Sequence, residues 1–415
     1  MIPVIDQVSG LICTPYRLDV PLDWDDPAGA KISVFARVVA RPGGRDLPYL
    51  VFLQGGPGGE APRPSGLPMN PSWLERALAD YRVVLLDQRG TGLSTPVSDD
   101  LLTRDAGAQA DYLKHFRADA IVRDCEAIRE HFGAQKWSVL GQSFGGFTSI
   151  NYLSRYASSL NEVYFTGGLP PVGRGVDEVY SRTYQLMAVL VDRHYRRFPG
   201  DRGRVAELVA RCTDGDITLP GGELVSPQRF RSIGHGLGFT GGSEALHYLL
   251  ERDPHTSGFR HDLDAQLPFG GRNPLYAVLH ESSYADGVVT DWSADRTYPE
   301  QFEADTTLLT GEHLFRSVFD ECAQLKPWKG AAELLALEPW PVLYEADALQ
   351  AAAVPCAAAI YFDDPYVFRD FSLETAALLP QLRVWVTSEH LHNGLRGSNG
   401  RVLDRLIALV RDTEY

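Results

Sequence analysis

Val139-Leu-Gly-Gln-Ser-Phe-Gly-Gly146 contains the pattern Gly-x-Ser-x-Gly, in which a strand turns sharply into a helix and the serine lies at the turn. Trp137–Leu140, just before it, is a short apolar run typical of a strand, and the apolar residues of Phe144–Tyr156 recur at roughly helical spacing. Glycines are needed here because strand and helix come so close that side chains beside the turn would clash. The sequence predicts a strand, a turn and a helix, with Ser143 as the candidate nucleophile. A structural turn with a buried serine is the alternative.

Apolar strands and amphipathic helices alternate on both sides of this turn. Further strands are predicted at 32–39, 49–53, 83–86, 163–165, 357–362 and 382–386, and further helices at 121–132 and 402–410. This alternation predicts an α/β fold with a mainly parallel sheet that is covered by helices on both faces. The first 60 residues are rich in strand patterns separated by Gly/Pro turns, so we expect antiparallel pairing there.

Residues 172–350 have a different character, because helix-like periods dominate and no clear buried strand is found. The periods are most evident at 180–198, 244–251 and 274–284. A chain of 415 residues is longer than one ordinary core supports, so a substantial insertion or a second domain is expected. We predict a core formed by residues 1–171 and 351–415, with a large helical cap, 172–350, inserted before the last strands.

Composition excludes several classes of function. The net charge of −15 argues against nucleic acid and anionic membranes as partners, since both require a basic surface. No apolar run reaches the roughly eighteen residues of a membrane span, and the N-terminus lacks the layout of a secretory signal, so cytoplasmic residence is predicted. The cysteines are odd in number and widely spaced, which indicates neither a disulfide framework nor a zinc site: Cys13, Cys125, Cys212, Cys322 and Cys356.

Two acids and two histidines follow late predicted strands in the chain order that α/β-hydrolases use, namely serine, acid, histidine. The acids are Asp363 and Asp364, and the histidines are His390 and His392. An ionised acid would fix the tautomer of the imidazole, whose other nitrogen could then take the proton of Ser143. We predict Asp364 and His392 for these roles, although local chemistry leaves the choice within each pair open.

The glycine-rich segment Gln54-Gly-Gly-Pro-Gly-Gly59 follows a predicted strand and is suited to holding an oxyanion. Glycine lets a substrate approach the main chain closely, so we assign the oxyanion hole to the N–H of Gly56, or of Gly55, and that of Phe144. A phosphate cradle is the alternative, but the segment lacks the Lys-Ser/Thr pair of a P-loop. Asp87 and Arg89 are expected to brace a neighbouring loop through charge-assisted hydrogen bonds.

Six motifs in one order resemble the longer bacterial form of the proline iminopeptidases, or prolyl aminopeptidases, and together they span nearly the whole chain. They are Gln54–Gly59, Asp87–Ser94, Gly141–Gly146, Gly167–Pro171, Asp363–Val367 and His392–Arg396. The resemblance implies an α/β-hydrolase fold with a helical cap, no metal or cofactor, and release of N-terminal proline from peptides. It also favours Asp364 and His392. Gln54 departs from the histidine usual in shorter members, and Pro365 stands where methionine is expected.

A free N-terminus is cationic, so its recognition calls for a carboxylate beside a pocket that admits the pyrrolidine ring. Glu281 and Glu312 in the predicted cap resemble the family's amine-binding glutamates, and a substrate cation would be the partner that a buried carboxylate needs. An exposed helix position or an ordinary ion pair is the alternative for each. Four aromatic side chains are candidates for the walls of the ring pocket: Tyr284, Phe239, Trp292 and Phe315.

The predicted function is therefore that of a serine aminopeptidase acting on small peptides with N-terminal proline through a prolyl ester at Ser143. An esterase or an aminopeptidase of broader specificity on the same scaffold is one alternative. A non-catalytic binding protein with a hydrolase fold is another, although a complete set of serine, acid and histidine argues against it. The sequence leaves the oligomeric state and the preferred peptide length open.

Overall fold

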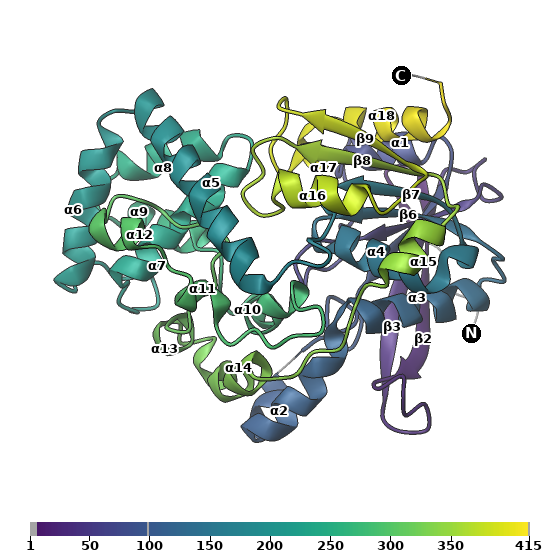
Figure 1. Cartoon of the computed structure of the whole chain (residues 1–415), viewed down its shortest axis with the longest axis horizontal. Coiled ribbons are helices and arrows are strands. Elements are labelled where there is room, and N and C mark those ends of the chain that lie inside the picture. Colours follow the sequence, from purple (N-terminus) through teal and green to yellow (C-terminus); the bar gives the residue numbers. More distant parts are fainter. Residues whose placement is uncertain (1–5, 98, 414–415) are drawn as a thin grey trace.

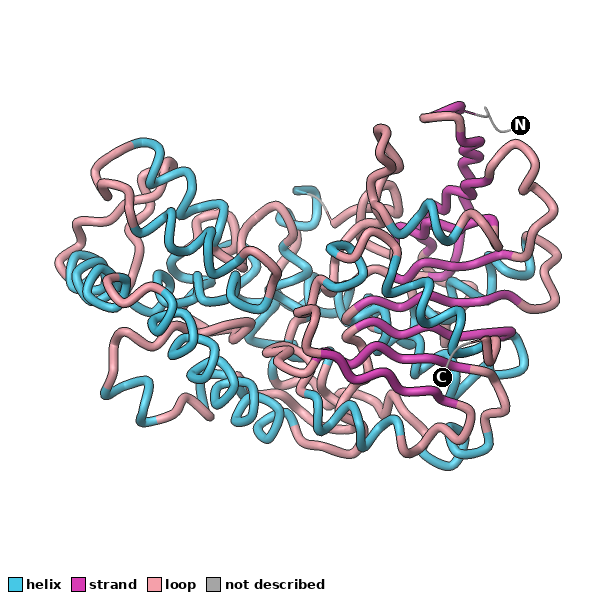
Figure 2. Tube along the Cα trace, turned by 90° about the horizontal axis from the view of Figure 1, so that it is seen from above, coloured by secondary structure: helices cyan, strands magenta, loops and turns pink. Residues whose placement is uncertain are grey.

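The computed structural model describes residues 6–97 and 99–413, and within them the strands form one sheet of nine members. Its order is β1-β2-β3-β5-β4-β6-β7-β8-β9, and the strands lie side by side in Figure 2. The strands are β1 (Asp6–Val8), β2 (Leu11–Pro21), β3 (Lys31–Ala40), β4 (Tyr49–Leu53), β5 (Arg82–Asp87), β6 (Trp137–Gln142), β7 (Leu160–Thr166), β8 (Cys356–Tyr361) and β9 (Leu382–Thr387). Pairing is antiparallel from β1 to β3 and between β3 and β5, and parallel from β5 to β9, so the predicted α/β class is confirmed.

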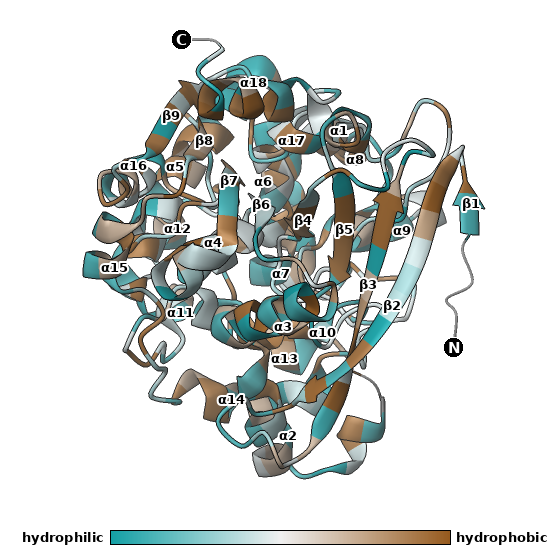
Figure 3. Cartoon of the chain, turned by 90° about the vertical axis from the view of Figure 1, so that its right-hand side faces the viewer, coloured by the Kyte–Doolittle hydropathy of each residue, from teal (hydrophilic) through white to brown (hydrophobic). Residues whose placement is uncertain are grey.

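The central strands read as unbroken apolar runs because both faces of the sheet are covered. Alternate residues of β4 contribute to two different cores: Val51 and Leu53 lie in one, and Leu50 and Phe52 in the other. On the first face pack α3 (Ala118–His131) and α4 (Phe144–Tyr156), and on the second α1 (Trp73–Ala77) and α18 (Arg401–Val410). Figure 3 shows these helix pairs on opposite sides of the sheet.

Between β7 and β8 the chain is helical, and its helices gather beside the sheet (Figure 1, teal and green). They are α5 (Val176–Arg197), α6 (Asp201–Thr213), α7 (Pro227–Arg231), α8 (Gly242–Leu250), α9 (Ser257–Gln266), α10 (Pro274–Leu279), α11 (Ser293–Arg296), α12 (Glu300–Ala304), α13 (Val318–Glu321), α14 (Lys329–Ala336) and α15 (Ala346–Ala351). In this fully described stretch the only strand-like pairing is the isolated bridge Thr218–Leu224. The boundaries of the cap stay a prediction.

The helical segment is joined to the core at several points. A third apolar cluster unites α2 (Ala106–Leu113) with α10, α13 and α14. In the chain, α2 precedes the Gly141-x-Ser143-x-Gly145 turn, called the elbow below. Before α15 the chain already runs along the core, where Asn151 of α4 donates a hydrogen bond to Leu343 O at 2.5 Å. The backbone N–H of His392 donates to Gly238 O at 3.1 Å, so a loop of the core touches the helical segment directly.

Several element bounds differ from those predicted. The helix predicted at 121–132 begins at Ala118, and the period at 274–284 is a short helix, α10, followed by a 3-10 turn at Glu281–Ser283. Strand β2 was not delimited by the pattern, because its middle residues are partly exposed and alternate poorly. After β8 and β9 come α16 (Arg369–Ala376) and the short α17 (Gly394–Gly397).

Among the described residues, no helix has the length and the apolar character that a bilayer crossing needs. All five cysteines are free and buried.

Candidate active site

Ser143 lies at the turn between β6 and α4 with φ 55° and ψ −126°, a strained conformation for a residue with a side chain. Its backbone is fixed on both sides: its N–H donates to Thr166 O at 3.1 Å, and its carbonyl accepts from the N–H of Gly146 at 2.7 Å. A Cβ on Gly145 would lie 1.9 Å from Leu53 O, so the close approach of helix and strand requires glycine there. The Ser143 hydroxyl does not cap α4, although serine commonly caps helices, and is therefore left for another partner.

Asp364 and His392 are joined by a hydrogen bond of 2.7 Å between Oδ2 and Nδ1, and both side chains are buried. The other carboxylate oxygen of Asp364 accepts the backbone N–H of Tyr366 at 3.0 Å and of Val367 at 3.1 Å. Burial disfavours the imidazolium form, but the charge and hydrogen bond of Asp364 outweigh it, and the pKa of His392 is raised above its usual value.

The two neighbours left open by local sequence lie elsewhere. Asp363 forms an ion pair of 2.9 Å with Arg193 of α5. His390 is partly exposed and packs edge-on against Tyr361 and Trp385. The structure thus joins Asp364, and not Asp363, to a histidine.

Two glycines after β7 connect the elbow to the acid. A Cβ on Gly168 would lie 2.6 Å from Ser143 O, and a Cβ on Gly167 would lie 3.1 Å from Asp364 Oδ2. The backbone of Gly167 and Gly168 therefore lies between the serine turn and the Asp364 carboxylate. Within the described part of the chain, no hydrogen bond connects Ser143 Oγ with His392.

The glycine-rich segment after β4 lies against the elbow. A Cβ on Gly55 would approach Ser143 Cβ to 2.9 Å, and Gly56 has φ 132°, a region open in practice only to glycine. Phe144 is the first residue of α4, where a backbone N–H has no partner within the helix and the helix dipole is positive. These amides belong to the two segments that meet at Ser143, which is the arrangement an oxyanion hole needs.

Asp87 and Arg89 form charge-assisted hydrogen bonds, as the sequence predicts, each with a partner distant in the chain. Asp87 accepts from Arg63 at 2.8 and 2.5 Å, and also from the N–H of Ala61 at 3.2 Å. Arg89 donates to Asp124 of α3 at 2.7 and 2.5 Å, and neither side chain of this pair is accessible to solvent. Both residues therefore hold loops of the core in place.

Glu312 lies within a group of aromatic and imidazole rings near His392. Its carboxylate accepts the hydroxyl of Tyr276, and its carbonyl accepts from His280 Nε2 at 3.0 Å. Burial lowers the pKa of His235 to about 4 and also lowers that of His280, and the charge of Glu312 opposes both shifts. The same charge acts on His392.

Tyr284, Tyr366 and Phe239 continue this group toward the Asp364–His392 pair. The ring of Tyr366 lies 4.8 Å from that of His392, and the ring of Phe239 lies 6.2 Å from it. The Tyr284 hydroxyl donates to Tyr366 O at 3.4 Å. Tyr366 was not singled out from the sequence, and its only signal was its place in the Asp363–Val367 motif.

Glu281 is buried and its carboxylate is already engaged by backbone. It accepts the N–H of Ser293 at 3.1 Å and of Ala294 at 2.9 Å, where α11 begins. Burial raises its pKa to about 7, and no cation lies within ion-pair distance among the described residues. Burial raises the pKa of Tyr180, and the charges of Glu281 and Glu312 raise it further.

The remaining two predicted ring-pocket residues have other partners. Trp292 packs against Phe319 at 5.8 Å between ring centroids, and Phe315 packs against Tyr298 at 5.7 Å.

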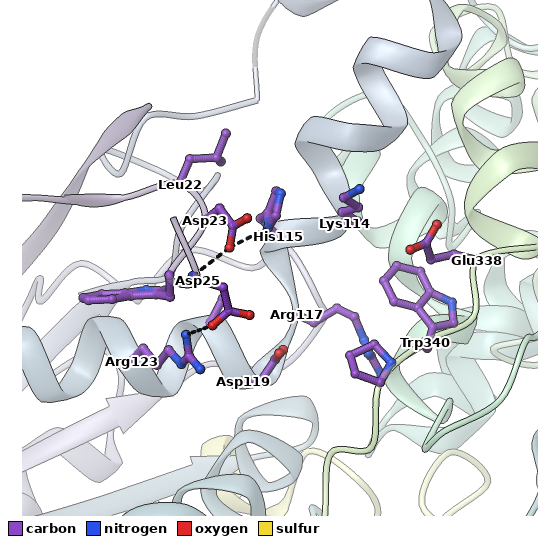
Figure 4. A pocket seen from close by; sticks show the side chains of 13 residues that line it. Leu22, Asp23, Asp25, Lys114, His115, Arg117, Asp119, Arg123, Glu338 and Trp340 are labelled. Atoms are coloured by element: carbon purple, nitrogen blue, oxygen red, sulfur yellow. Dashed lines mark hydrogen bonds and ion pairs between the residues drawn. The ribbon is translucent and has the colours of Figure 1, made fainter. Parts of the chain in front are cut away.

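A pocket of about 230 Å³ lies apart from the rings that surround Glu312 and His392 (Figure 4). Its walls carry both charge signs, with Asp23, Lys114 and Arg123 among them, and Trp340 on one side. None of its lining residues is a predicted site residue.

Comparison with known proteins agrees with this geometry. A family model of the alpha/beta hydrolase fold matches residues 48–209. A proline iminopeptidase of Aeromonas sobria is 43% identical over 99% of this chain and 99% of that protein. Proline iminopeptidase aneH of Aspergillus aculeatus is 34% identical over 96% of this chain and 93% of that protein, and a probable proline iminopeptidase of Streptomyces coelicolor is 32% identical over 40% of this chain. Since two of these likenesses extend over nearly the whole chain, it belongs to the proline iminopeptidase family of the α/β-hydrolase superfamily.

Proposed function

We propose that this protein is a serine aminopeptidase that releases N-terminal proline from small peptides, with Ser143 as nucleophile, His392 as general base and Asp364 as its partner. The observation that carries the proposal is the 2.7 Å hydrogen bond between Asp364 and His392, formed beside the strained turn that presents Ser143. Because Nδ1 of His392 donates its proton to the carboxylate, Nε2 is the nitrogen free to accept the proton of a hydroxyl.

The reaction runs through an acyl-enzyme. Ser143 Oγ attacks the prolyl carbonyl while His392 Nε2 takes its proton, and the N–H groups of Gly56 and Phe144 hold the oxyanion. His392 then gives that proton to the departing amine, which leaves as the shortened peptide. Water attacks the resulting prolyl ester, again with His392 as the base, and free proline and Ser143 are regenerated.

Specificity for a free N-terminus follows from the acidic residues of the helical segment. Glu312 lies in the ring group beside His392, and its carboxylate would face the cationic amine, with Tyr284 against the pyrrolidine ring. Glu281 is buried with no cation beside it in the described structure, so a bound ammonium would supply the missing countercharge. Holding the amine at a fixed distance from Ser143 restricts cleavage to the first peptide bond.

The direct test is kcat/KM on proline, alanine and leucine arylamides beside a p-nitrophenyl ester, for wild type and Ser143→Ala. Strong preference for the prolyl arylamide, abolished in the variant while the fold is retained, is the expected result. Ester hydrolysis without amide hydrolysis would replace the aminopeptidase by an esterase. Stoichiometric labelling of wild type by a fluorophosphonate, absent in Ser143→Ala, excludes a non-catalytic binding protein.

We also propose that the protein works in the cytoplasm. The five free, buried cysteines suit a reducing compartment, which supports work in the cytoplasm. The proposed partners are small peptides alone, without nucleic acid or membrane, in keeping with a net charge of −15. No metal or cofactor takes part in the proposed reaction.

A further inference from the structure

Arg396 lies where three loops of the site meet. It belongs to α17, which begins two residues after His392. Its Nη2 donates to Gln54 Oε1 at 2.9 Å and is 3.5 Å from Gln142 Oε1. Gln54 immediately precedes Gly55 of the oxyanion segment, and Gln142 immediately precedes Ser143. The guanidinium is therefore one side chain away from both the oxyanion segment and the nucleophile.

This cation has no acidic partner among the described residues. Its hydrogen bonds go to two neutral amide oxygens, and burial alone lowers its pKa, with no neighbouring carboxylate to oppose the shift. Leaving a partly desolvated cation uncompensated is costly, so an anionic ligand would supply the missing countercharge. Its charge reaches the reacting groups, because it lowers the pKa of His392.

The guanidinium is nevertheless available to a ligand. Although its guanidinium is partly desolvated, Arg396 as a whole residue keeps an exposed surface, and both of its hydrogen bonds use the single nitrogen Nη2, so the other donors of the planar fork remain. Its backbone is held firmly: the N–H donates to Asn393 O at 2.9 Å, and the carbonyl accepts from Ser72 Oγ at 3.2 Å. A fixed guanidinium with open donors is suited to pairing with a carboxylate in two parallel hydrogen bonds.

We propose that Arg396 binds the C-terminal carboxylate of the substrate and makes the enzyme selective for prolyl dipeptides. This inference rests on the proposed function. A dipeptide spans about 7 Å and carries a cation at one end and a carboxylate at the other, with the scissile bond between them. Glu312 holds the amine end, Ser143 attacks the middle, and Arg396, tied to the neighbours of Ser143 and Gly55, receives the far end. A longer peptide places its carboxylate beyond this point.

The test compares Pro-Gly with Pro-Gly-amide, which differ only in the terminal charge, and with Pro-Gly-Gly. For wild type, kcat/KM on Pro-Gly exceeds that on the amide by about tenfold or more, the size expected of one charge-assisted pair. In Arg396→Gln this ratio falls to about one, whatever the absolute rates. Arg396→Lys keeps part of the ratio, because a point charge remains without the planar fork. Arg401→Gln is the matched control, since Arg401 lies on α18 and donates to Ser398 O, and it keeps the wild-type ratio.

A second variant leaves Arg396 in place. Gln54→Glu sets a carboxylate against Nη2, so the arginine is already paired and the ratio falls toward one. If wild type shows no preference for Pro-Gly over its amide, or if Arg396→Gln lowers both rates equally with the ratio intact, Arg396 only positions the loops and the inference is wrong. Wild-type turnover of a prolyl arylamide separates the two proposals: its absence removes the proposed function itself, and its presence with an unchanged ratio removes only the role of Arg396.

Discussion

Asp364 Oδ2 lies 2.7 Å from His392 Nδ1, while Asp364 Oδ1 accepts two backbone N–H groups at 3.0 and 3.1 Å. The carboxylate is thus held by three donors, and its direction is fixed before substrate arrives. Such preorganisation sets both the tautomer of His392 and the orientation of its free nitrogen. Asp363, one residue away, is instead paired with Arg193 of α5.

Asp364→Asn tests this relationship. An asparagine amide placed at Oδ2 presents a donor to Nδ1, which favours the wrong tautomer, and kcat is expected to fall by about 10³- to 10⁴-fold with the fold retained. Asp363→Asn is the matched control. It breaks only the ion pair with Arg193, half of whose side chain is exposed, and kcat should stay within about twofold of wild type. Equal losses in the two variants would contradict the assignment.

Local sequence does not decide between Asp363 and Asp364. Both acids follow the same strand, so only the family resemblance separates them. The choice is made by the chain after β8, which turns so that the N–H groups of Tyr366 and Val367 meet Asp364. Such a contact depends on tertiary structure, and no periodicity or spacing encodes it.

The fold itself was more accessible, because it follows from local patterns. The central strands are buried on both faces, so their apolar runs identify them in the sequence. The Gly-x-Ser-x-Gly turn marks where β6 ends and α4 begins. Strand β2 is not predicted, because its middle residues are partly exposed and its apolar and polar residues do not alternate regularly. Among the site residues, Glu281 was identified as an acid of the helical segment, but its two backbone donors at α11 were not foreseeable. Arg396 has no sequence signal beyond its motif, since its partners lie 342 and 254 positions away.

The acid limb of the pH profile should report His392. Its pKa is raised in the folded enzyme, chiefly because Asp364 outweighs burial, and only the neutral imidazole acts as a base. Rates therefore decline as pH falls through a value above about 6.5, the ordinary pKa of histidine. The measurement is kcat/KM for a neutral p-nitrophenyl ester, whose binding requires no amine anchor. A profile flat from pH 5 to 8 would contradict this role.

Amine recognition should add a second dependence on pH. Burial raises the pKa of Glu281 to about 7, so this carboxyl loses its charge as pH falls below that value, while the prolyl amine remains a cation. KM for a prolyl arylamide is therefore expected to rise below pH 7 more steeply than KM for the ester. In Glu281→Gln this difference should vanish, and at pH 8 the variant should show a KM at least about tenfold higher for the arylamide, with ester hydrolysis little changed.

Glu312→Gln distinguishes the two glutamates. Its carboxylate lies in the ring group beside His392 and accepts the hydroxyl of Tyr276, and its charge acts on His392, whose pKa it helps to raise. We expect a larger loss of prolyl arylamide kcat/KM than in Glu281→Gln, together with a lower acid-limb pKa for His392, because the anion that favours the imidazolium is removed. An unchanged acid limb in Glu312→Gln would place Glu312 away from His392 in solution.

Gly145→Ala tests the packing that makes the elbow possible. A Cβ at this position would lie 1.9 Å from Leu53 O, a backbone atom of the central strand β4, so neither side chain rotation nor a small shift relieves the clash. Strand and helix must separate, and the expected loss in the free energy of unfolding is about 2 kcal/mol or more, measured by urea denaturation. Gly270→Ala is the control, because a Cβ there meets nothing within 4 Å and the variant should differ from wild type by less than about 0.5 kcal/mol.

Since the displaced helix carries Phe144, any Gly145→Ala protein that folds should also lose oxyanion stabilisation, seen as a lower kcat with KM little changed. Wild-type stability together with wild-type kcat would show that the close approach of α4 to β4 is not needed to build the turn.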